Sequence, residues 1–268
     1  PTAVWVAPVT KVGVGRALEV IHEKKAPLLI LGRGSNLLVS DLGWDGVTLY
    51  VGENFSNWTF DYRQAKVLAG TLLMDLIRAA VNKGLSGLEL LSGIPGGVGG
   101  ALRMNAGAFG QEIEQVTVSV SGFRRDGTPF SADRHKINFD YRRVPELDRV
   151  VITSAIFQFT EKNSAALRAR SEDILALRAG KQPLNYPSCG SVFKRPAGHY
   201  AGALIEETGL KGKRIGGAMI SRKHAGFILN VDNAKAVDVY ALIQLIEARV
   251  LNRFGVQLER EVKLIGEF

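Results

Sequence analysis

The chain has 268 residues, 46% hydrophobic and 22% charged, as expected for a globular protein of one or two domains. It has no apolar run of the roughly 18 residues that span a bilayer and no secretory pattern, so we expect a cytoplasmic protein outside any membrane. With one cysteine, Cys189, and four histidines, the sequence excludes a disulfide framework and offers no metal-ligand cluster.

The net charge of +8 favours an anionic partner. The basic residues are dispersed and form no known nucleic-acid motif, while phosphorylated small molecules suit the charge as well. Composition alone does not choose between these partners. The first residue is Pro1 rather than methionine, so we expect the natural N-terminus to precede this numbering.

Hydrophobic periodicity and turn residues predict many short strands and a few helices. Strands are expected at residues 3–7, 28–31, 46–50, 66–69, 116–120, 150–159, 216–220, 227–230 and 256–265. Helices are expected at residues 10–24, 71–83, 164–178, 199–207 and 233–254, with N-caps at Thr10, Thr71, Asn163 or Ser164, and Asn233. Asp126-Gly127 predicts a hairpin turn. Strands and helices do not alternate regularly in the first 160 residues, which predicts an α+β fold.

A first candidate loop, Gly32-Arg33-Gly34-Ser35-Asn36-Leu37, follows an apolar strand that we expect to be fully buried. It superficially matches a dinucleotide-binding fingerprint, but Leu37 takes the third glycine position and no amphipathic helix follows. A Rossmann fold is therefore disfavoured. The loop could present backbone N–H groups, Ser35 and Asn36 to a pyrophosphate, although a simple strand-to-turn connection fits equally well.

A second candidate loop is the glycine-rich segment from Gly93 to Gly110, GIPGGVGGALRMNAGAFG, in which seven of 18 residues are glycine. Glycine lacks a Cβ, so such a segment can lie flush against a flat or anionic ligand. Its backbone N–H groups can also converge on phosphate oxygens. The segment also holds Ile94, Val98 and Leu102, which a solvated linker does not need. We interpret it as an ordered, ligand-facing loop.

Three polar residues lie far apart in the sequence: Arg142 before a turn, Ser191 among turn residues, and Glu261 in the last expected strand. Each has an ordinary structural interpretation when taken alone. An arginine after a tyrosine often covers apolar surface with its stem, and a strand glutamate often points to water. No nucleophile–base pair is evident, so a serine hydrolase has little support.

Six motifs occur together in one order: GRGSNLLV (32–39), the glycine-rich segment, Tyr141-Arg142, PSCGSVFKRP (187–196), RIGGAMISRKHAGFILN (214–230) and LEREVKLIGE (258–267). In this combination the chain resembles the UDP-N-acetylenolpyruvoylglucosamine reductase family over nearly its whole length. The resemblance implies an α+β fold with a two-subdomain FAD-binding region of the vanillyl-alcohol-oxidase (PCMH) type and a C-terminal α+β substrate domain. The implied boundaries are residues 1–60 with 258–268 for the first FAD-binding subdomain, residues 61–160 for the second, and residues 161–257 for the substrate-binding domain.

The resemblance also implies an activity in peptidoglycan precursor synthesis. NADPH reduces FAD, hydride passes to C3 of the enolpyruvyl group of UDP-N-acetylglucosamine-enolpyruvate, and a proton reaches C2 to give UDP-N-acetylmuramate. Ser191 matches the proton donor. Arg142 and Glu261 match the residues that polarise the substrate carboxylate and stabilise an enolate-like intermediate. A cation beside developing negative charge lowers a barrier in this way.

The positions that match FAD contacts are Gly32, Arg33, Gly34, Ser35, Asn36, Leu37, Gly93, Ile94, Pro95, Gly96, Gly99, Asn105, Ala106, Gly107 and Ala108. The positions that match contacts to the UDP-sugar are Tyr141, Lys194, Arg195 and His224. Cationic side chains at such positions suit a diphosphate. No metal is implied, and we expect a monomer that binds neither nucleic acid nor membrane.

The sequence departs from the family pattern at two places. Val144 replaces a serine that many members carry after Tyr-Arg, so a hydroxyl contact is lost there. The segment between Arg142 and Cys189 is too short for the substrate-capping insertion of the larger subclass, which indicates the shorter subclass. The family's usual N-terminal Thr-Thr and Gly-Gly segment is also expected before Pro1.

Three alternative functions stay open from the residues alone. An FAD-linked oxidase of the same fold would share the FAD loops but not PSCGSVFKRP or LEREVKLIGE, and no histidine or cysteine stands out as a covalent flavin anchor. A non-catalytic nucleotide-sugar-binding protein would not need Ser191, Arg142 and Glu261 together. A basic nucleic-acid-binding protein would show salt-dependent retention on DNA.

Overall fold

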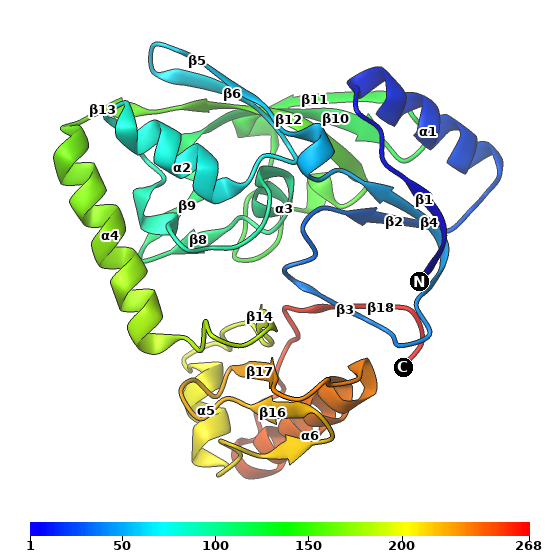
Figure 1. Cartoon of the computed structure of the whole chain (residues 1–268), viewed down its shortest axis with the longest axis vertical. Coiled ribbons are helices and arrows are strands. Elements are labelled where there is room, and N and C mark those ends of the chain that lie inside the picture. The colour runs from blue at the N-terminus through cyan, green and yellow to red at the C-terminus, as the bar shows by residue number, and fades with distance from the viewer. The chain divides into compact units, whose positions relative to one another are not determined.

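The computed structural model describes residues 1–268, and its internal contacts divide the chain into two compact units (Figure 1). The unit that is expected to bind the flavin, here called the flavin-side unit, comprises residues 2–33 and 46–176. The C-terminal unit comprises residues 34–45 and 177–268 together with Pro1. The three-region division expected from the sequence stays a prediction. None of the helices combines the length and the apolar character needed to cross a membrane.

The flavin-side unit is built on a five-stranded antiparallel sheet in the order β11-β10-β12-β6-β5 (Figure 1). It also contains a three-stranded sheet in the order β1-β4-β2, and α1 lies between β1 and β2 in the sequence. Its strands are β1 (Thr2–Val6), β2 (Leu28–Leu31), β4 (Trp44–Tyr50), β5 (Trp58–Asp61), β6 (Gln64–Leu68), β7 (Leu85–Ser86), β8 (Gly107–Ala108), β9 (Gln111–Glu112), β10 (Thr117–Arg124), β11 (Pro129–Asp133), β12 (Val150–Gln158) and β13 (Thr160–Glu161). Its helices are α1 (Lys11–Glu23), α2 (Leu73–Asn82), α3 (Val98–Arg103) and most of α4 (Ser164–Lys181). The 3₁₀ turns are η1 (Glu53–Phe55), η2 (Glu89–Leu91), η3 (Ile113–Val116), η4 (Arg134–Lys136) and η5 (Pro145–Leu147).

The core of this unit forms where the sheet meets the apolar faces of α2 and α3. Leu73, Leu76 and Ile77 of α2 are fully buried, as their helical spacing predicts. The expected stop at Gly84 is confirmed, because that residue has φ +71° after the last turn. The expected cap at Thr71 is wrong. Its hydroxyl bonds to the backbone of Asn57, and the helix starts later without a side-chain cap.

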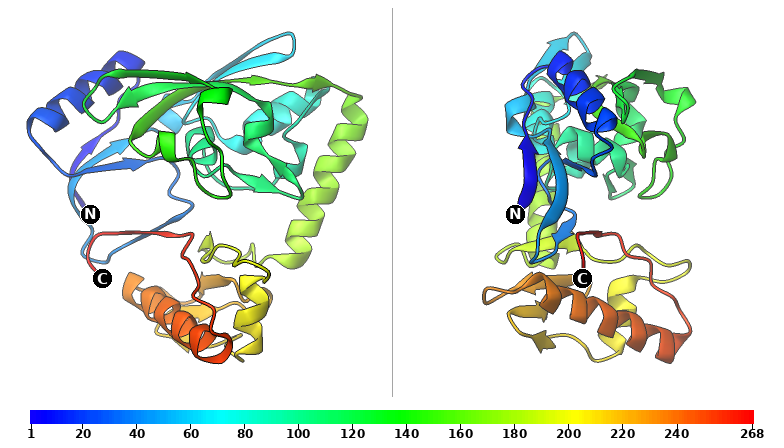
Figure 2. Two further views of the ribbon diagram at one scale, coloured as in Figure 1. Left: turned by 180° about the vertical axis from the view of Figure 1, so that it is seen from behind. Right: turned by 90° about the vertical axis from the view of Figure 1, so that its right-hand side faces the viewer.

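The C-terminal unit is a four-stranded antiparallel sheet, β14-β17-β16-β15, against which α5 and α6 pack (Figure 2). Its elements are β3 (Leu37–Val39), β14 (Ser188–Ser191), α5 (Ala201–Glu207), β15 (Arg214–Ile215), β16 (Ala218–Ile220), β17 (Phe227–Asn230), α6 (Ala236–Phe254) and β18 (Lys263–Ile265). Leu242, Ile243 and Ile246 of α6 are fully buried. In addition, β18 pairs in parallel with β3, so the end of the chain returns to residues 37–39.

The start of α6 differs from the sequence-based expectation. Asn233 does not cap the helix; it has φ +48° and lies before the N-cap, Lys235. The carboxylate of Asp41 instead accepts the N–H groups of Ala236 and Val237 at 2.8 and 3.1 Å. Asp238 adds a local contact by accepting the N–H of Lys235 at 3.0 Å, whereas the Asp41 contacts are supplied across the tertiary structure and no local pattern predicts them.

Two other expectations need correction. The strand Leu28–Leu31 is half-buried rather than fully buried, because only part of the strand surface is covered. The expected strand over residues 256–265 is regular only at Lys263–Ile265. Before it, residues 259–261 pair with residues 192–194 through isolated backbone hydrogen bonds and do not form a continuous strand. The remaining strands lie within a few residues of their expected positions.

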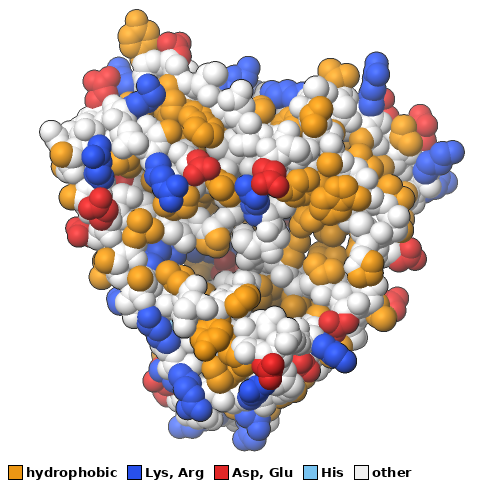
Figure 3. All heavy atoms as spheres, viewed as in Figure 1, with side chains coloured by type: hydrophobic (Ala, Val, Ile, Leu, Met, Phe, Trp, Pro, Cys, Tyr) orange, Lys and Arg blue, Asp and Glu red, His pale blue; other side chains and the backbone are white.

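Lysine and arginine side chains are interspersed with aspartate and glutamate on the face shown in Figure 3. The dispersed basic residues of the sequence therefore remain dispersed on this face of the fold.

Candidate functional site

The first candidate loop follows β2 and spans the division between the units. Gly32 and Arg33 belong to the flavin-side unit, where Arg33 pairs with Glu53 at 3.2 Å. Gly34, with φ +68°, opens the turn that leads into β3 in the C-terminal unit. There the Asn36 amide donates to the backbone oxygen of Glu261 at 3.1 Å, and Asn36 accepts the N–H of Lys263. Asn36 thus fixes the segment that carries Glu261.

The glycine-rich segment packs one side against the end of β6 and leaves its other side open. A Cβ on Gly99 would lie 2.9 Å from the Ala69 side chain, so glycine is needed there for close packing. A Cβ on Gly100 or Gly110 would meet nothing within 4 Å. The segment therefore forms a wall of the unit that is bare at Gly100 and Gly110, while the side chains of Pro95 and Phe109 in the same segment are exposed.

This wall also presents hydrogen-bond donors. The backbone N–H groups of Gly96, Gly97 and Gly100 donate to no oxygen of the chain. Together with the open space at Gly100 and Gly110, these donors fit a flat, anionic group such as FAD. Sequence reasoning missed Gly97 and Gly100 as candidate donors. The sequence signal that could have found them is their place just before, and in the first turn of, a helix, where N–H groups have no intrahelical partner.

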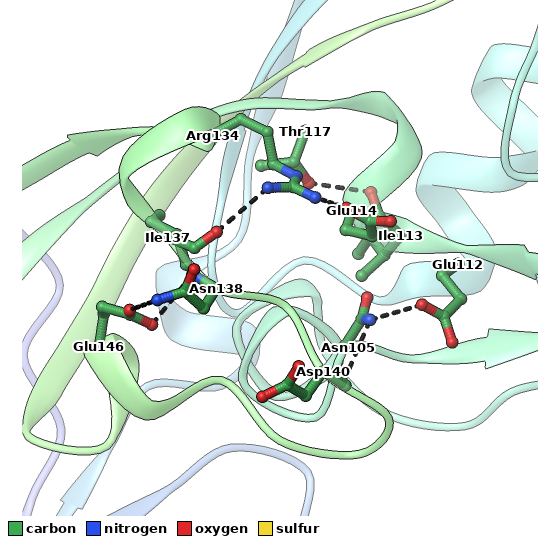
Figure 4. Close-up of polar contacts among 10 residues, drawn as sticks. All are labelled: Asn105, Glu112, Ile113, Glu114, Thr117, Arg134, Ile137, Asn138, Asp140 and Glu146. Atoms are coloured by element: carbon green, nitrogen blue, oxygen red, sulfur yellow. Dashed lines mark hydrogen bonds and ion pairs between the residues drawn. The ribbon is translucent and has the colours of Figure 1, made fainter.

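Asn105 lies at the end of this segment and is fully buried. Its Nδ2 donates to Glu112 Oε2 at 2.6 Å and to the backbone oxygen of Asp140 at 3.4 Å (Figure 4). The side chain thus braces the protein internally. The expected FAD contact at Asn105 stays a prediction.

Arg142 lies in a tight turn that approaches the same segment. Its guanidinium donates to the backbone oxygens of Asn105 and Gly107 at 3.3 and 2.9 Å. It also lies over the ring of Tyr141, 5.1 Å from the ring centroid. The candidate catalytic cation is therefore attached to the loop that was expected to hold the cofactor. Val144, at the position of the family serine, is buried and packs in the core of this unit.

Ser191 and Glu261 lie close together in the C-terminal unit. Ser191 ends β14 after an irregularity in the pairing with β17, with Gly190 at φ +79°. Such irregularities re-aim a side chain. The next residue, Val192, accepts the N–H groups of Glu261 and Val262 through its backbone oxygen, at 2.8 and 3.3 Å. The fold thus joins two segments that are distant in the sequence.

Cys189 lies two residues before Ser191, in the core of the C-terminal unit. It is buried, and desolvation raises the pKa of its thiol to about 11. The thiolate is the reactive form of cysteine, so this residue is a core side chain at neutral pH.

The expected cationic contacts have different environments. Lys194 Nζ pairs with Glu259 Oε1 at 2.5 Å, and its side chain is only 13% exposed. The Arg195 guanidinium lies 4.5 Å from the ring centroid of the exposed Tyr200. Lys194 is thus already held by a carboxylate.

His224 is not a cation in this fold. Its Nδ1 accepts the N–H of Gly226 at 3.1 Å, which leaves Nε2 as the protonated nitrogen of a neutral ring. Desolvation by burial lowers the pKa of His224, and the nearby Lys211 lowers it further. The expected contact of His224 with the UDP-sugar stays a prediction, and in this environment the neutral ring can offer an N–H donor rather than a charge.

Comparison with known proteins defines the class of protein first. A family model described as an FAD binding domain matches residues 2–132, and one described as the C-terminal domain of UDP-N-acetylenolpyruvoylglucosamine reductase matches residues 182–265. With the FAD-compatible wall of the flavin-side unit, these matches define an FAD-containing oxidoreductase. The expected fold class is confirmed.

The relatives define the family. The chain is 41% identical to the UDP-N-acetylenolpyruvoylglucosamine reductase of Syntrophomonas wolfei, over 100% of this chain and 90% of the relative. It is 44% identical to that of Pediococcus pentosaceus, over 91% of this chain and 82% of the relative. The crystal structure of the UDP-N-acetylenolpyruvylglucosamine reductase from Thermus caldophilus superposes with a TM-score of 0.82 at 36% identity, covering 98% of this chain and 91% of that one. The chain belongs to the UDP-N-acetylenolpyruvoylglucosamine reductase family.

Proposed function

We propose that this protein uses NADPH, through FAD, to reduce UDP-N-acetylglucosamine-enolpyruvate to UDP-N-acetylmuramate in the cytoplasm. Family membership supports the reaction, because the relatives carry the name of this reductase. The observation that carries the proposal within this chain is the attachment of Arg142 to the backbone oxygens of Asn105 and Gly107. It links a candidate substrate-binding cation to the FAD-compatible loop.

The residues that would hold FAD lie in the two candidate loops. The N–H groups of Gly96, Gly97 and Gly100 donate to no oxygen of the chain, and the segment is open at Gly100 and Gly110. The chemistry supplied by bound FAD is hydride transfer from NADPH to C3 of the enolpyruvyl group. No side chain of the protein can supply that redox step.

Arg142 and Glu261 would act on the substrate carboxylate. A guanidinium beside that carboxylate stabilises the negative charge that grows on it as C3 accepts hydride. Arg142 is suited to this because its orientation is already fixed by two carbonyl oxygens, so little reorganisation accompanies the reaction. The backbone of Glu261 is fixed by Val192 and Asn36, which supports a defined position for this residue.

Ser191 would deliver the proton to C2. A serine hydroxyl is a weak acid, so it can serve only toward a basic acceptor such as an enolate and in a preorganised site. The pairing irregularity before Ser191 and the positive φ of Gly190 support such preorganisation. Tyr141, Lys194, Arg195 and His224 are proposed as contacts to the UDP-sugar, with His224 as a neutral N–H donor.

The direct test is a stopped-flow trace of flavin absorbance with FAD-loaded protein under anaerobic conditions. NADPH should bleach the flavin band, and UDP-N-acetylglucosamine-enolpyruvate should restore it. Recovery only on admission of oxygen would indicate an oxidase with another substrate and would overturn the proposal. A protein that binds the nucleotide sugar but takes up no flavin would indicate a non-catalytic binding role.

A further inference from the structure

The turn that carries Arg142 has a backbone that needs outside support. Asp140 and Arg143 exchange two backbone hydrogen bonds, at 2.9 and 3.2 Å, so Tyr141 and Arg142 lie at the tip of a tight turn. Arg142 has φ +55°, a region that side-chain-bearing residues rarely adopt. Such a conformation persists only where neighbouring groups hold it.

Asn105 supplies that support from the glycine-rich segment. Its Nδ2 donates to the backbone oxygen of Asp140 at 3.4 Å, at the start of the turn. In return, the Arg142 guanidinium donates to the backbone oxygens of Asn105 and Gly107. The two segments are therefore joined in both directions. Asn105 has an unusual backbone itself, with φ +40°, so this contact joins two strained positions.

Glu112 decides which way the Asn105 amide faces. Its carboxylate accepts from Asn105 Nδ2 at 2.6 Å, while the Oδ1 of this buried amide has no hydrogen-bond partner (Figure 4). Rotating the amide by half a turn would set Oδ1 against the Glu112 carboxylate and the Asp140 oxygen, and all three are acceptors. An ionised carboxylate therefore selects the orientation in which the NH₂ group faces the turn.

The pairing of β8 with β9 brings Glu112 to this position. Gly107 and Glu112 lie opposite each other in that pair, and a Cβ on Gly107 would lie 2.6 Å from Glu112 Cγ. Glycine at this position thus leaves room for the glutamate side chain. This is a packing reason for Gly107, separate from its expected FAD contact.

We propose that Glu112 is a positioning residue for Arg142, acting through the side chain of Asn105. The inference rests on the proposed role of Arg142 toward the substrate carboxylate. Glu112 does not touch the substrate in this account. It fixes the amide that fixes the turn, and the turn sets the direction of the guanidinium.

Glu114 provides a matched control. It lies two residues further along the same segment, but its carboxylate pairs with Arg134, which also donates to the backbone oxygen of Ile137 (Figure 4). Glu114 therefore supports residues 134–137, which precede the Arg142 turn, and the carboxylate that bonds Asn105 is that of Glu112. Replacing either glutamate removes one negative charge from the same part of the unit.

The test compares the two half-reactions in FAD-loaded variants. Glu112→Ala should slow flavin reoxidation by UDP-N-acetylglucosamine-enolpyruvate by up to about 100-fold, the scale of a misplaced catalytic group, and leave flavin reduction by NADPH near wild type. Glu112→Gln retains an acceptor oxygen but adds an NH₂ donor that can also face Asn105 Oδ1, so it should restore only part of the lost rate. Glu114→Gln should leave the ratio of the two rates unchanged, even if its thermal unfolding midpoint falls.

A double-mutant cycle with Arg142→Ala separates positioning from a general loss of folding. If Glu112 acts through Arg142, Glu112→Ala should have little further effect in the Arg142→Ala enzyme. Additive effects, or equal losses in both half-reactions, would overturn the inference. If Arg142→Ala slows flavin reoxidation and Glu112→Ala does not, the inference about Glu112 is overturned and the proposed role of Arg142 stands. A wild-type rate in Arg142→Ala would overturn the proposed role of Arg142 as well.

Discussion

The backbone N–H of Glu261 donates to the backbone oxygen of Val192 at 2.8 Å. This single bond ties the last segment of the chain to the end of β14, directly after Ser191. An isolated bridge between Phe193 and Arg260 continues the contact. The relative position of the two candidate catalytic side chains is thus set by main-chain geometry, which side-chain substitutions at either position should leave intact.

Replacing Ser191 tests the proton-delivery role. Ser191→Ala removes the hydroxyl but keeps the backbone of β14, so flavin reduction by NADPH should continue at nearly the wild-type rate. Reoxidation by substrate should slow by about 10²–10⁴-fold, the usual contribution of general acid catalysis. Single-turnover absorbance measurements of each half-reaction would check this. Equal slowing of both halves would contradict the assignment.

Glu247 should stabilise the segment that carries Glu261. Its carboxylate accepts two hydrogen bonds from Arg260, at 2.5 and 2.6 Å. The Arg260 side chain is 30% exposed and the Glu247 side chain 26% exposed, so the pair is largely shielded from solvent. Glu247→Ala should lower the free energy of unfolding in urea by about 1.5–3 kcal/mol, as expected for hydrogen bonds to a charged group.

The more exposed pair between Arg214 and Asp232 is the control for Glu247. Asp232→Ala should cost less than about 1 kcal/mol, because solvent screens an exposed pair. A cost for Asp232→Ala that equals or exceeds the cost for Glu247→Ala would show that burial and bidentate geometry do not set the stability here.

Asp41 should stabilise α6 from a distance. Asp41→Ala leaves the N–H groups of Ala236 and Val237 without their acceptor and should cost about 1 kcal/mol of unfolding free energy, as for other lost caps. Asn233→Gly should cost little, because Asn233 has φ +48° and glycine adopts that region readily. Urea denaturation of the two variants would compare them. A larger loss with Asn233→Gly would restore Asn233 as the important residue at this helix start.

The lowered pKa of His224 predicts a pH dependence of stability. The folded state disfavours the protonated ring, so the unfolded chain binds more protons between the folded pKa and the ordinary value of about 6.5. Unfolding free energy should therefore decrease as the pH falls below about 6.5 toward the folded pKa. The decrease should be smaller in His224→Gln. NMR titration of the ring protons would measure the pKa directly, and a value above 6.5 would contradict the neutral assignment.

Local patterns predicted the elements whose causes are local. The helix start at Thr10 is confirmed, because its hydroxyl accepts the N–H of Gly13 at 3.0 Å. Asn163 is the cap of α4, accepting from Ala166 at 3.0 Å. The αL stop at Gly255 follows the longest helix, as expected. In each case the donor and acceptor lie within one turn of chain, so a sequence window contains the whole interaction.

The two helix caps that the sequence predicted wrongly have a cause that is not local. Thr71 and Asn233 have the right chemistry for caps, but Thr71 has its partner in the segment around Asn57, and the α6 cap comes from Asp41. The competing partner in each case lies far away in sequence. Local propensity is then outweighed by a tertiary contact that no window of sequence contains.

The sequence by itself determined the family, the α+β class and the candidate residues, because ordered motifs and hydrophobic periodicity are written along the chain. Tertiary structure alone decided which of those residues meet and in what state. It placed Glu261 beside the end of β14, bonded Asn105 to both Glu112 and the turn that carries Arg142, and set the N–H of Gly226 against His224 Nδ1. Orientation and charge state depend on neighbours brought together by folding, and these neighbours are distant in sequence.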